Sequence, residues 1–400
     1  MKPSQRHLAL LSRWGGLSLS AALLCACSST PLPPTEGEPP ASAVSAPSAA
    51  SAAASASTAQ VEAVTTAVIT PQVLSTPGDA DSYSARDDAR ALARDIAQAH
   101  ELDEAWVWSA LSAARYKSQA ARLMMPAPRG TAKNWGVYRS RFIEPIRIRA
   151  GIAFWQQYQA ELQRAQAQYG VPAEIIAGVI GVETIYGRYT GNFRVLDVLT
   201  TLSLDFPTGR SDRSPFFKKE LGAFLKLCAE QQLAPDAVLG SYAGAIGWPQ
   251  FMPSSIRRWG VDFDGDGQVN LQRSPVDAIG SVAHYLAEHG WRTGQPTFFD
   301  VTPPEDAAAR AKLLAPDIVP SFSADEMRAL GAILPDAAMQ HPGSLALVLL
   351  ENGDAAPTLI AGTQNFYAIT RYNQSSYYAL AVIELGQAVS QAPASSSGNP

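Results

Sequence analysis

The chain has 400 residues, 46% of them hydrophobic, so it is long enough to bury one large core or two ordinary ones. Its net charge of −5 excludes the broad basic surface that nucleic-acid binding requires. Three cysteines do not suggest a disulfide framework, and Cys228, the only one beyond residue 27, is expected to be a small core residue.

Residues 1–27 have the features of an export signal. Three basic residues precede a short apolar run, which is too short to span a bilayer. The run ends in Leu24-Cys-Ala-Cys27, which resembles the lipobox of bacterial lipoproteins. The resemblance implies lipid attachment to Cys27 and, because Ser28 follows, sorting to the periplasmic side of the outer membrane. An ordinary cleaved signal that leaves a free periplasmic protein is the alternative.

Three segments follow the signal. Residues 28–82 are mostly Ala, Ser, Pro and Thr, and such a composition cannot bury enough apolar surface to offset its ordering entropy, so a flexible tether is predicted. Residues 83–388 are predicted to form one folded domain, and residues 389–400 a disordered tail. A tether lets a lipid-anchored domain reach a target away from the membrane.

Helical periodicity dominates the folded part. Helices are predicted over 87–100, 104–125, 145–169, 171–187, 193–204, 216–232, 275–290 and 377–385. In the third of these, the expected buried stripe is Ile152, Trp155, Tyr158 and Leu162. Strand signals are confined to 345–350 and 357–360, on either side of an Asn-Gly turn. The fold class is therefore mainly α with a small β part (α+β).

The helix predicted over 171–187 carries a carboxyl group on its apolar side. That side consists of Ile176, Val179, Ile180 and Val182. Glu183 projects between them, and burial disfavours an ionised carboxylate, so its pKa is expected to be raised, as a general acid near neutral pH requires. A structural Glu bonded to the backbone or to an Arg explains this stretch equally well. Pro172 is expected in the first turn and Gly187 at the end.

An aspartate-rich loop begins like a Ca²⁺-binding EF-hand loop. Positions 1, 3, 5 and 7 hold the candidate metal ligands Asp262, Asp264, Asp266 and Gln268. Position 12 is Arg273 in place of a bidentate carboxylate, and Asp277 is the nearest carboxylate beyond it. Two readings remain open, a weak structural Ca²⁺ site or a turn-stabilised loop without metal. In both, the role is structural.

Five stretches of the sequence have motifs that point to the same family. They are residues 169–188, which contain Glu183; 240–255, with Gly240-Ser-Tyr-Ala-Gly and Pro249-Gln-Phe-Met-Pro; the aspartate loop; 275–283; and 365–373. Together they resemble the membrane-bound lytic transglycosylase B family of bacterial murein hydrolases. The resemblance implies a lysozyme-like helical core with additional helical and β parts. It also implies cleavage of the β-1,4 bond between N-acetylmuramic acid and N-acetylglucosamine, with formation of 1,6-anhydromuramic ends. No cofactor is required for this chemistry.

The resemblance also implies roles for single residues. Glu183 matches the single catalytic acid/base. Glycosidases commonly use two carboxylates, and one is sufficient if the substrate supplies the nucleophile. The implied substrate-binding residues are Ser241, Gln250, Phe251, Tyr138, Tyr372, Asn373, Tyr378 and Arg210. Arg213 is an alternative to Arg210 as the partner of stem-peptide carboxylates, and core positions are alternatives for Phe251 and Tyr378.

Two other functions compete with this one. A lysozyme-type hydrolase would release reducing ends in place of anhydro ends. A non-catalytic peptidoglycan-binding lipoprotein is opposed by the presence of Glu183. The expected partners are peptidoglycan glycan strands, the membrane through the lipid, and other cell-wall enzymes.

Overall fold

The computed structural model describes residues 81–125 and 133–392. The signal segment, Cys27, nearly all of the tether and residues 393–400 lie outside this part, so their predictions stay untested. Within it helices dominate and strands are few, which confirms the predicted mainly α class. None of the helices in the described ranges is long and apolar enough to cross a membrane.

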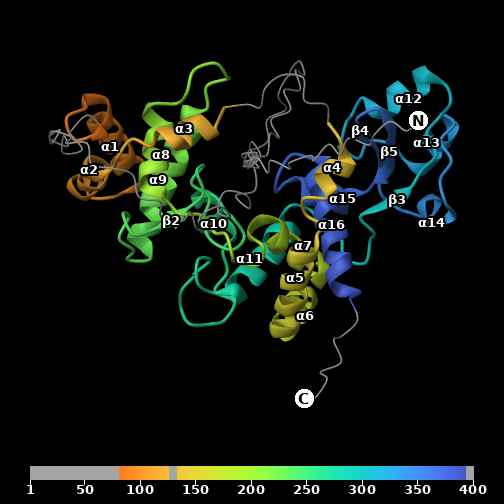
Figure 1. The fold of residues 1–400 in the computed structure, drawn as a ribbon, viewed down its shortest axis with the longest axis horizontal. Coiled ribbons are helices and arrows are strands. Elements are labelled where there is room, and N and C mark those ends of the chain that lie inside the picture. The colour runs from red at the N-terminus through yellow and green to blue at the C-terminus, as the bar shows by residue number, and fades with distance from the viewer. Residues whose placement is uncertain (1–80, 126–132, 393–400) are drawn as a thin grey trace, which may run out of the picture.

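The elements are spread along one long axis (Figure 1). One end contains α1 (Asp87–His100), α2 (Glu104–Ala113), α3 (Ser118–Leu123), α8 (Val195–Leu204), α9 (Ser214–Glu230), and the two-stranded ladder of β1 (Phe193–Arg194) and β2 (Leu239–Gly240). The middle contains α4 (Trp135–Arg139), α5 (Pro145–Gln157), α6 (Gln159–Tyr169), α7 (Ala173–Thr184), α10 (Pro253–Trp259), α11 (Pro275–Glu288), α15 (Gln364–Thr370) and α16 (Ser376–Ser390). The other end contains β3 (Phe298–Asp300), β4 (Ala346–Asn352), β5 (Ala355–Gly362), α12 (Ala307–Leu314), α13 (Ala324–Ala329) and α14 (Asp336–Met339).

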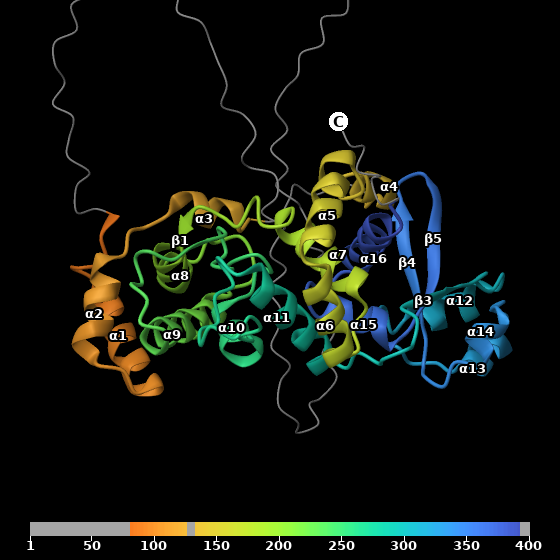
Figure 2. The same ribbon diagram turned by 90° about the horizontal axis from the view of Figure 1, so that it is seen from below.

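Helix α7 is the centre of the core. Every residue of α7 except Glu174 is buried, because α16, α5, α6 and α11 surround it (Figure 2). The closest approach is to α16, where a Cβ added to Gly178 would lie 2.2 Å from the carbonyl oxygen of Val382. Glycine is therefore needed at this crossing. Burial on all sides explains why α7 is apolar around most of its circumference.

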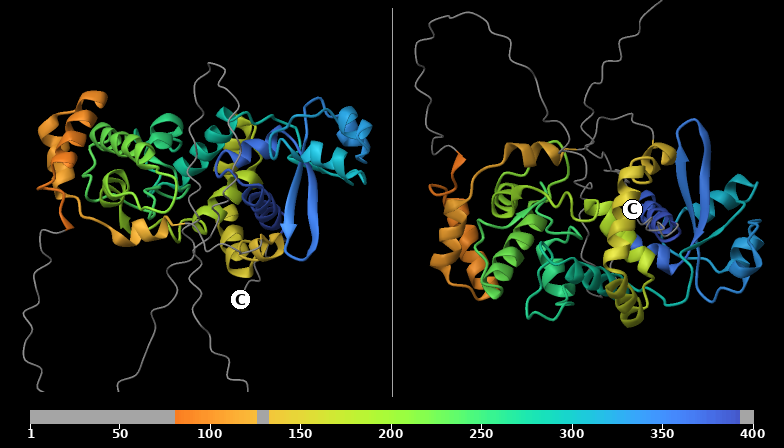
Figure 3. Two further views of the ribbon diagram at one scale, coloured as in Figure 1. Left: turned by 90° about the horizontal axis from the view of Figure 1, so that it is seen from above. Right: turned by 60° about the horizontal axis from the view of Figure 1, so that its bottom comes forward.

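The three-stranded sheet has the order β3-β5-β4 and is antiparallel throughout. The predicted hairpin is confirmed as β4 and β5, with Gly353 in the left-handed region at its tip. The hairpin stands beside α16, as Figures 2 and 3 show. The hairpin tip also pairs with the segment before α4, since Asn352 bridges to Asn134 and the Gly353 N–H donates to the Lys133 carbonyl at 3.1 Å.

Two predicted helices are broken. The segment 145–169 bends at Tyr158 (φ −116°, ψ 27°), which separates α5 from α6. The bend changes the buried face, so the predicted stripe is wrong except at Leu162: Phe154 is buried, whereas Ile152, Trp155 and Tyr158 are half-buried. The segment 104–125 is interrupted after Ala113, where the Arg115 N–H donates to the buried Asp197 carboxylate at 3.0 Å.

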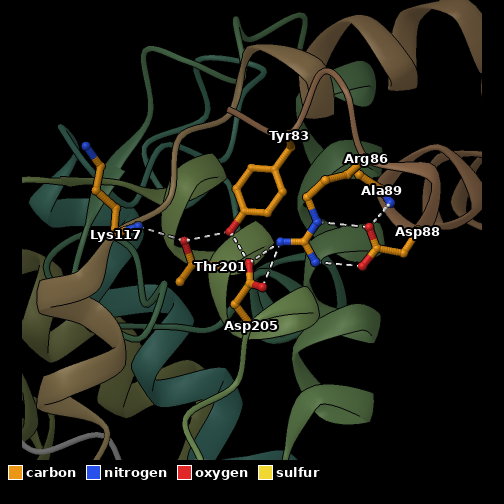
Figure 4. A network of polar contacts seen from close by, with 7 residues as sticks. All are labelled: Tyr83, Arg86, Asp88, Ala89, Lys117, Thr201 and Asp205. Carbon is orange, nitrogen blue, oxygen red and sulfur yellow. Dashed lines mark hydrogen bonds and ion pairs between the residues drawn. The ribbon is translucent and has the colours of Figure 1, made fainter. Parts of the chain in front are cut away.

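A polar network fixes the start of the folded part (Figure 4). The Tyr83 hydroxyl donates to Asp205 at 2.7 Å, and Arg86 binds the same carboxylate at 2.7 Å and that of Asp88 at 2.6 Å. The Thr201 hydroxyl accepts the Lys117 N–H at 2.9 Å. At the other end α16 continues to Ser390 with Val389 buried, two residues beyond the boundary predicted at 388.

Candidate active site

Glu183 lies in the last turn of α7 and is only 7% exposed. The Tyr378 hydroxyl, from the first turn of α16, donates to its Oε1 at 2.6 Å. Burial raises the pKa of Glu183 from 4.5 to about 7, and the Tyr378 hydrogen bond and the Arg147 charge act in the opposite direction. The raised pKa predicted from the sequence is therefore confirmed, and the carboxyl group holds its proton near neutral pH.

The end of α7 differs from the prediction. At the start of the helix, Pro172 is the N-cap residue, just before the first turn. At its end, Gly187 (φ 81°) is preceded by two further left-handed residues, Ile185 (φ 51°) and Tyr186 (φ 54°). A β-branched residue rarely adopts this conformation. The turn is secured by Thr184, whose hydroxyl donates to the Trp248 carbonyl at 2.9 Å and accepts the Gly187 N–H at 3.0 Å. Glu183 therefore projects from a rigid turn.

Three tyrosines surround the carboxyl group. Tyr378 stacks on Tyr372 with the ring centroids 6.1 Å apart, and the Tyr372 hydroxyl donates to the Pro249 carbonyl at 2.7 Å. Tyr138 comes from α4, and its ring packs on that of Phe142 with the centroids 5.0 Å apart. Burial, and after it the negative charge of Glu183, raises the pKa of all three phenols. Sequence positions 138, 183, 372 and 378 are thus brought together.

Ser241 and Gln250 shape the loop beside this cluster. The Ser241 hydroxyl oxygen accepts the Ala245 N–H at 3.0 Å, so its proton is left for another acceptor. The Gln250 side-chain N–H group donates to the carbonyls of Thr190 at 3.1 Å and Gly247 at 2.8 Å. These bonds join the segment after α7 to the segment before α10, and they leave Oε1 of Gln250 to accept from a ligand.

Phe251 occupies the core position that was the alternative to substrate binding. Its ring is 2% exposed and packs against Tyr285 and Tyr372, with centroids 5.4 and 5.7 Å apart. Phe251 therefore supports Tyr372 from the core side. Tyr378, 1% exposed, likewise reaches Glu183 from within the core.

Asn373 presents an unused acceptor. It is 8% exposed, and its buried Oδ1 has no hydrogen-bond partner among the described residues. A buried polar atom without a partner is costly, so such groups concentrate where a ligand completes them. Asn373 follows Tyr372 directly, which places this acceptor next to the tyrosine cluster.

Arg210 is not brought to Glu183. Its Nη1 donates to the Met124 carbonyl, and it lines a surface hollow with Leu92 and Phe206 that does not include Glu183. Burial lowers the pKa of Arg210, and burial together with the Arg210 charge lowers that of Arg213. The two guanidinium groups are thus neighbours, and neither forms an ion pair with a described carboxylate.

Arg147 belongs to the site although the sequence analysis did not select it. It is 4% exposed, and its charge acts on Glu183. A signal was present: Arg147 shares the buried face of α5 with Ala150, Gly151 and Phe154, at the helical spacing i+3, i+4 and i+7. A cation on such a face needs a specific partner.

The aspartate loop gathers three carboxylates. Asp262, Asp264 and Asp266 each offer an oxygen atom, and these atoms lie within 4.8 Å of one another. Asp277 closes the loop by accepting the N–H groups of Phe263 at 2.9 Å and Asn270 at 2.7 Å. Gln268 is exposed. The oxygen donors fit a hard cation, and the exposed Arg273 supplies no ligand at position 12.

Burial of Glu183 should make stability depend on pH. The folded protein keeps this proton up to about pH 7, whereas the unfolded chain releases it near 4.5, so stability falls as pH rises between these values. Glu183→Gln removes this loss. The free energy of unfolding of the variant, relative to that of wild type, is expected to rise by up to about 3 kcal/mol between pH 4 and pH 8. Urea unfolding at both pH values measures it. An equal difference at the two pH values would contradict the assigned pKa.

Comparison with known proteins supports a specific family. Residues 84–387 match the family model of the transglycosylase SLT domain. The chain is 40% identical over 305 residues to membrane-bound lytic murein transglycosylase B of Escherichia coli strain K12, covering 73% of this chain and 80% of that protein.

Solved structures agree. The catenated lytic transglycosylase SltB1 of Pseudomonas aeruginosa has a TM-score of 0.71 and 40% identity, covering 78% of this chain and 99% of that chain. Escherichia coli Slt35 in complex with calcium has a TM-score of 0.66 and 38% identity, covering 78% and 95%. Pseudomonas aeruginosa SltB3 in complex with NAG-anhNAM-pentapeptide has a TM-score of 0.64 and 29% identity, covering 76% and 79%.

Proposed function

Because the chain belongs to the transglycosylase SLT domain family, and is a lytic murein transglycosylase that cleaves peptidoglycan, we propose that Glu183 is its single acid/base. The fold is the lysozyme-like fold of lytic transglycosylases. The observation that carries the proposal is the buried Glu183 carboxyl group, whose pKa is raised to about 7 while Tyr378 donates to its Oε1. A carboxyl group with this pKa can both give and take a proton near neutral pH.

The reaction divides into two proton transfers. Glu183, protonated on Oε2 because Oε1 accepts from Tyr378, donates to the glycosidic oxygen between N-acetylmuramic acid and N-acetylglucosamine as the C1–O bond breaks. The N-acetyl group of the substrate stabilises the developing positive charge at C1. The Glu183 carboxylate then takes the proton of the C6 hydroxyl as this oxygen bonds to C1, which forms the 1,6-anhydro ring and restores the acid.

The surrounding residues suit the binding of a sugar chain. The Ser241 proton, the Tyr138 hydroxyl, Oε1 of Gln250 and Oδ1 of Asn373 offer donors and acceptors for hydroxyl and acetamido groups. Arg210 and Arg213 together suit the carboxylates of a peptide stem. The relative SltB3 was solved with NAG-anhNAM-pentapeptide, which supports a glycan with an attached peptide as the ligand here.

Mass spectrometry of digested sacculi tests the product. Purified protein incubated with sacculi is expected to release muropeptides that end in 1,6-anhydromuramic acid. Products heavier by one water would instead establish the lysozyme-type hydrolase. Absence of any release by folded protein that still binds sacculi would support the non-catalytic alternative.

The aspartate loop is proposed as a weak structural Ca²⁺ site. Asp262, Asp264 and Asp266 would hold the ion, and the calcium complex of Slt35 supports this choice. Added Ca²⁺ is expected to raise the thermal midpoint relative to EDTA, because an ion that binds only the folded state stabilises it. Asp262→Ala should abolish the difference. Equal midpoints of wild type in Ca²⁺ and EDTA would leave the loop as a turn stabilised by its own hydrogen bonds.

The proposed location of the protein rests on the N-terminal sequence. Lipid on Cys27 and a tether over residues 28–82 would hold the catalytic domain, residues 83–388, at the periplasmic side of the outer membrane, within reach of other cell-wall enzymes. The name of the E. coli relative, membrane-bound, supports the anchor. Fractionation of wild type and Cys27→Ser tests it: only wild type should sediment with outer membranes.

A further inference from the structure

Arg147 is a buried cation beside the proposed acid. It lies in the first turn of α5, where the Glu144 carboxylate caps the helix by accepting the N–H groups of Ile146 at 2.7 Å and Arg147 at 2.6 Å. Its guanidinium carbon lies 5.0 Å from the ring centroid of Phe142, and none of the ion pairs in the described ranges includes it. A buried charge of this kind needs compensation from hydrogen bonds or from a nearby opposite charge.

The end of α7 supplies the hydrogen bonds. Nη1 of Arg147 donates to the carbonyl oxygens of Gly181 at 2.5 Å and Val182 at 3.2 Å. The Gly181 carbonyl also accepts the Ile185 N–H at 3.2 Å, and a cation at this end of a helix is favoured by the helix dipole. Since Val182 directly precedes Glu183, these bonds hold the backbone from which the acid projects, and α5 lies alongside α7 (Figure 2).

The charge of Arg147 also acts on Glu183. The charged or titratable groups that face its carboxyl group are Tyr138 on α4, Arg147 on α5, Tyr372 after α15 and Tyr378 on α16. Arg147 is the cation among these four described groups, and its charge lowers the pKa of Glu183 against the larger effect of burial.

The Glu144 carboxylate and the Tyr186 hydroxyl also act on Arg147, and the effect of Glu144 is larger than that of Glu183. Burial lowers the pKa of Arg147, and these two groups and Glu183 oppose that shift. The guanidinium therefore stays charged and favours the carboxylate form of its neighbour.

We infer that Arg147 is a positioning residue for the reaction, which fixes the last turn of α7 under Glu183 and stabilises the Glu183 carboxylate that exists between the two proton transfers. The inference rests on the proposed role of Glu183. It assigns two separable effects to one side chain: the hydrogen bonds fix geometry, and the charge sets the proton affinity of the acid.

Two substitutions separate these effects. Arg147→Met keeps the apolar stem and removes both the charge and the bonds, whereas Arg147→Lys keeps the charge. The titration of Glu183 is followed by NMR of ¹³C-labelled glutamate side chains, with its signal identified by its loss in Glu183→Gln. In Arg147→Met the midpoint is expected to rise by about one pH unit. We expect kcat for anhydromuropeptide release to fall about tenfold, with KM unchanged, and the alkaline limb of the pH profile to move upward by the same amount.

In Arg147→Lys the midpoint should stay at the wild-type value while kcat falls, because an ammonium group does not reproduce the fixed geometry of the guanidinium. Arg149→Met, two residues along α5 and exposed, is the matched control and should leave both quantities unchanged.

Folded Arg147→Met with the wild-type midpoint and kcat would overturn the inference. If Arg147→Met does not fold, the Arg147→Lys variant provides the test. A wild-type kcat of Arg147→Lys would then overturn the inference. A different result would contradict the proposed function: full activity of the Glu183→Gln variant. That result is independent of the results for the Arg147 variants.

Discussion

Glu183→Gln is expected to reduce the release of anhydromuropeptides from sacculi by about 10³-fold or more. Glutamine has nearly the same shape and still accepts the Tyr378 hydrogen bond, but it has no proton to give to the glycosidic oxygen. It is also unable to take the proton of the C6 hydroxyl, so both transfers lose their partner. Release is measured by mass spectrometry of timed digests, with binding to sacculi measured separately.

The matched control is Glu174→Gln, at the start of the same helix α7 and away from the tyrosine cluster. This variant should keep wild-type release. Binding of Glu183→Gln to sacculi should also persist, because the other hydrogen-bonding groups proposed to bind the sugar chain are unchanged. Activity of Glu183→Gln near the wild-type level would show that another group is the acid.

Tyr378→Phe is expected to lower kcat about 10–100-fold while the protein remains folded. The phenol donates to Oε1 of Glu183 at 2.6 Å, which fixes the carboxyl group and directs its proton to Oε2. The same bond favours the carboxylate and lowers the pKa of Glu183. Without it, the alkaline limb of the pH profile should move to higher pH. The pH dependence of kcat measured between pH 4 and pH 9 checks both effects.

Tyr377→Phe is the control for this change. The Tyr377 hydroxyl accepts the Glu351 N–H at 2.7 Å and so ties α16 to β4, and its ring packs against Tyr138. Loss of this hydroxyl should lower the free energy of unfolding by about 1 kcal/mol and leave the pH profile of activity unchanged. A Tyr378→Phe profile identical to wild type would mean that the hydrogen bond to Glu183 has no part in catalysis.

Much of this site could be predicted from local sequence patterns. The apolar run 171–187 predicted the helix and the burial of Glu183, and the Asn-Gly pair predicted the hairpin. The spacing of Asp262, Asp264 and Asp266 predicted their convergence. Each of these features is set by residues close together in the chain, so periodicity and turn chemistry contain the information.

Other features depend on long-range packing. Tyr378 and Glu183 are 195 positions apart, and no local pattern indicates that they bond. Phe251 was expected at a sugar because motifs do not tell which side of an aromatic ring faces the core. The bend at Tyr158, which moved the buried face to Phe154, is likewise decided by contacts between helices.

The left-handed turn behind Glu183 has a consequence for attempts to make this enzyme more heat-resistant. Ile185 and Tyr186 each pay on the order of 1 kcal/mol for their backbone conformation, so glycine at either position would relieve the strain. The Tyr186 ring, however, fills the space between Gly151 and Gly181, where an added Cβ would meet it at about 2.5 Å. Glycine at position 186 would therefore remove the strain but leave a cavity in the core, so the usual change to glycine does not make this turn more heat-resistant.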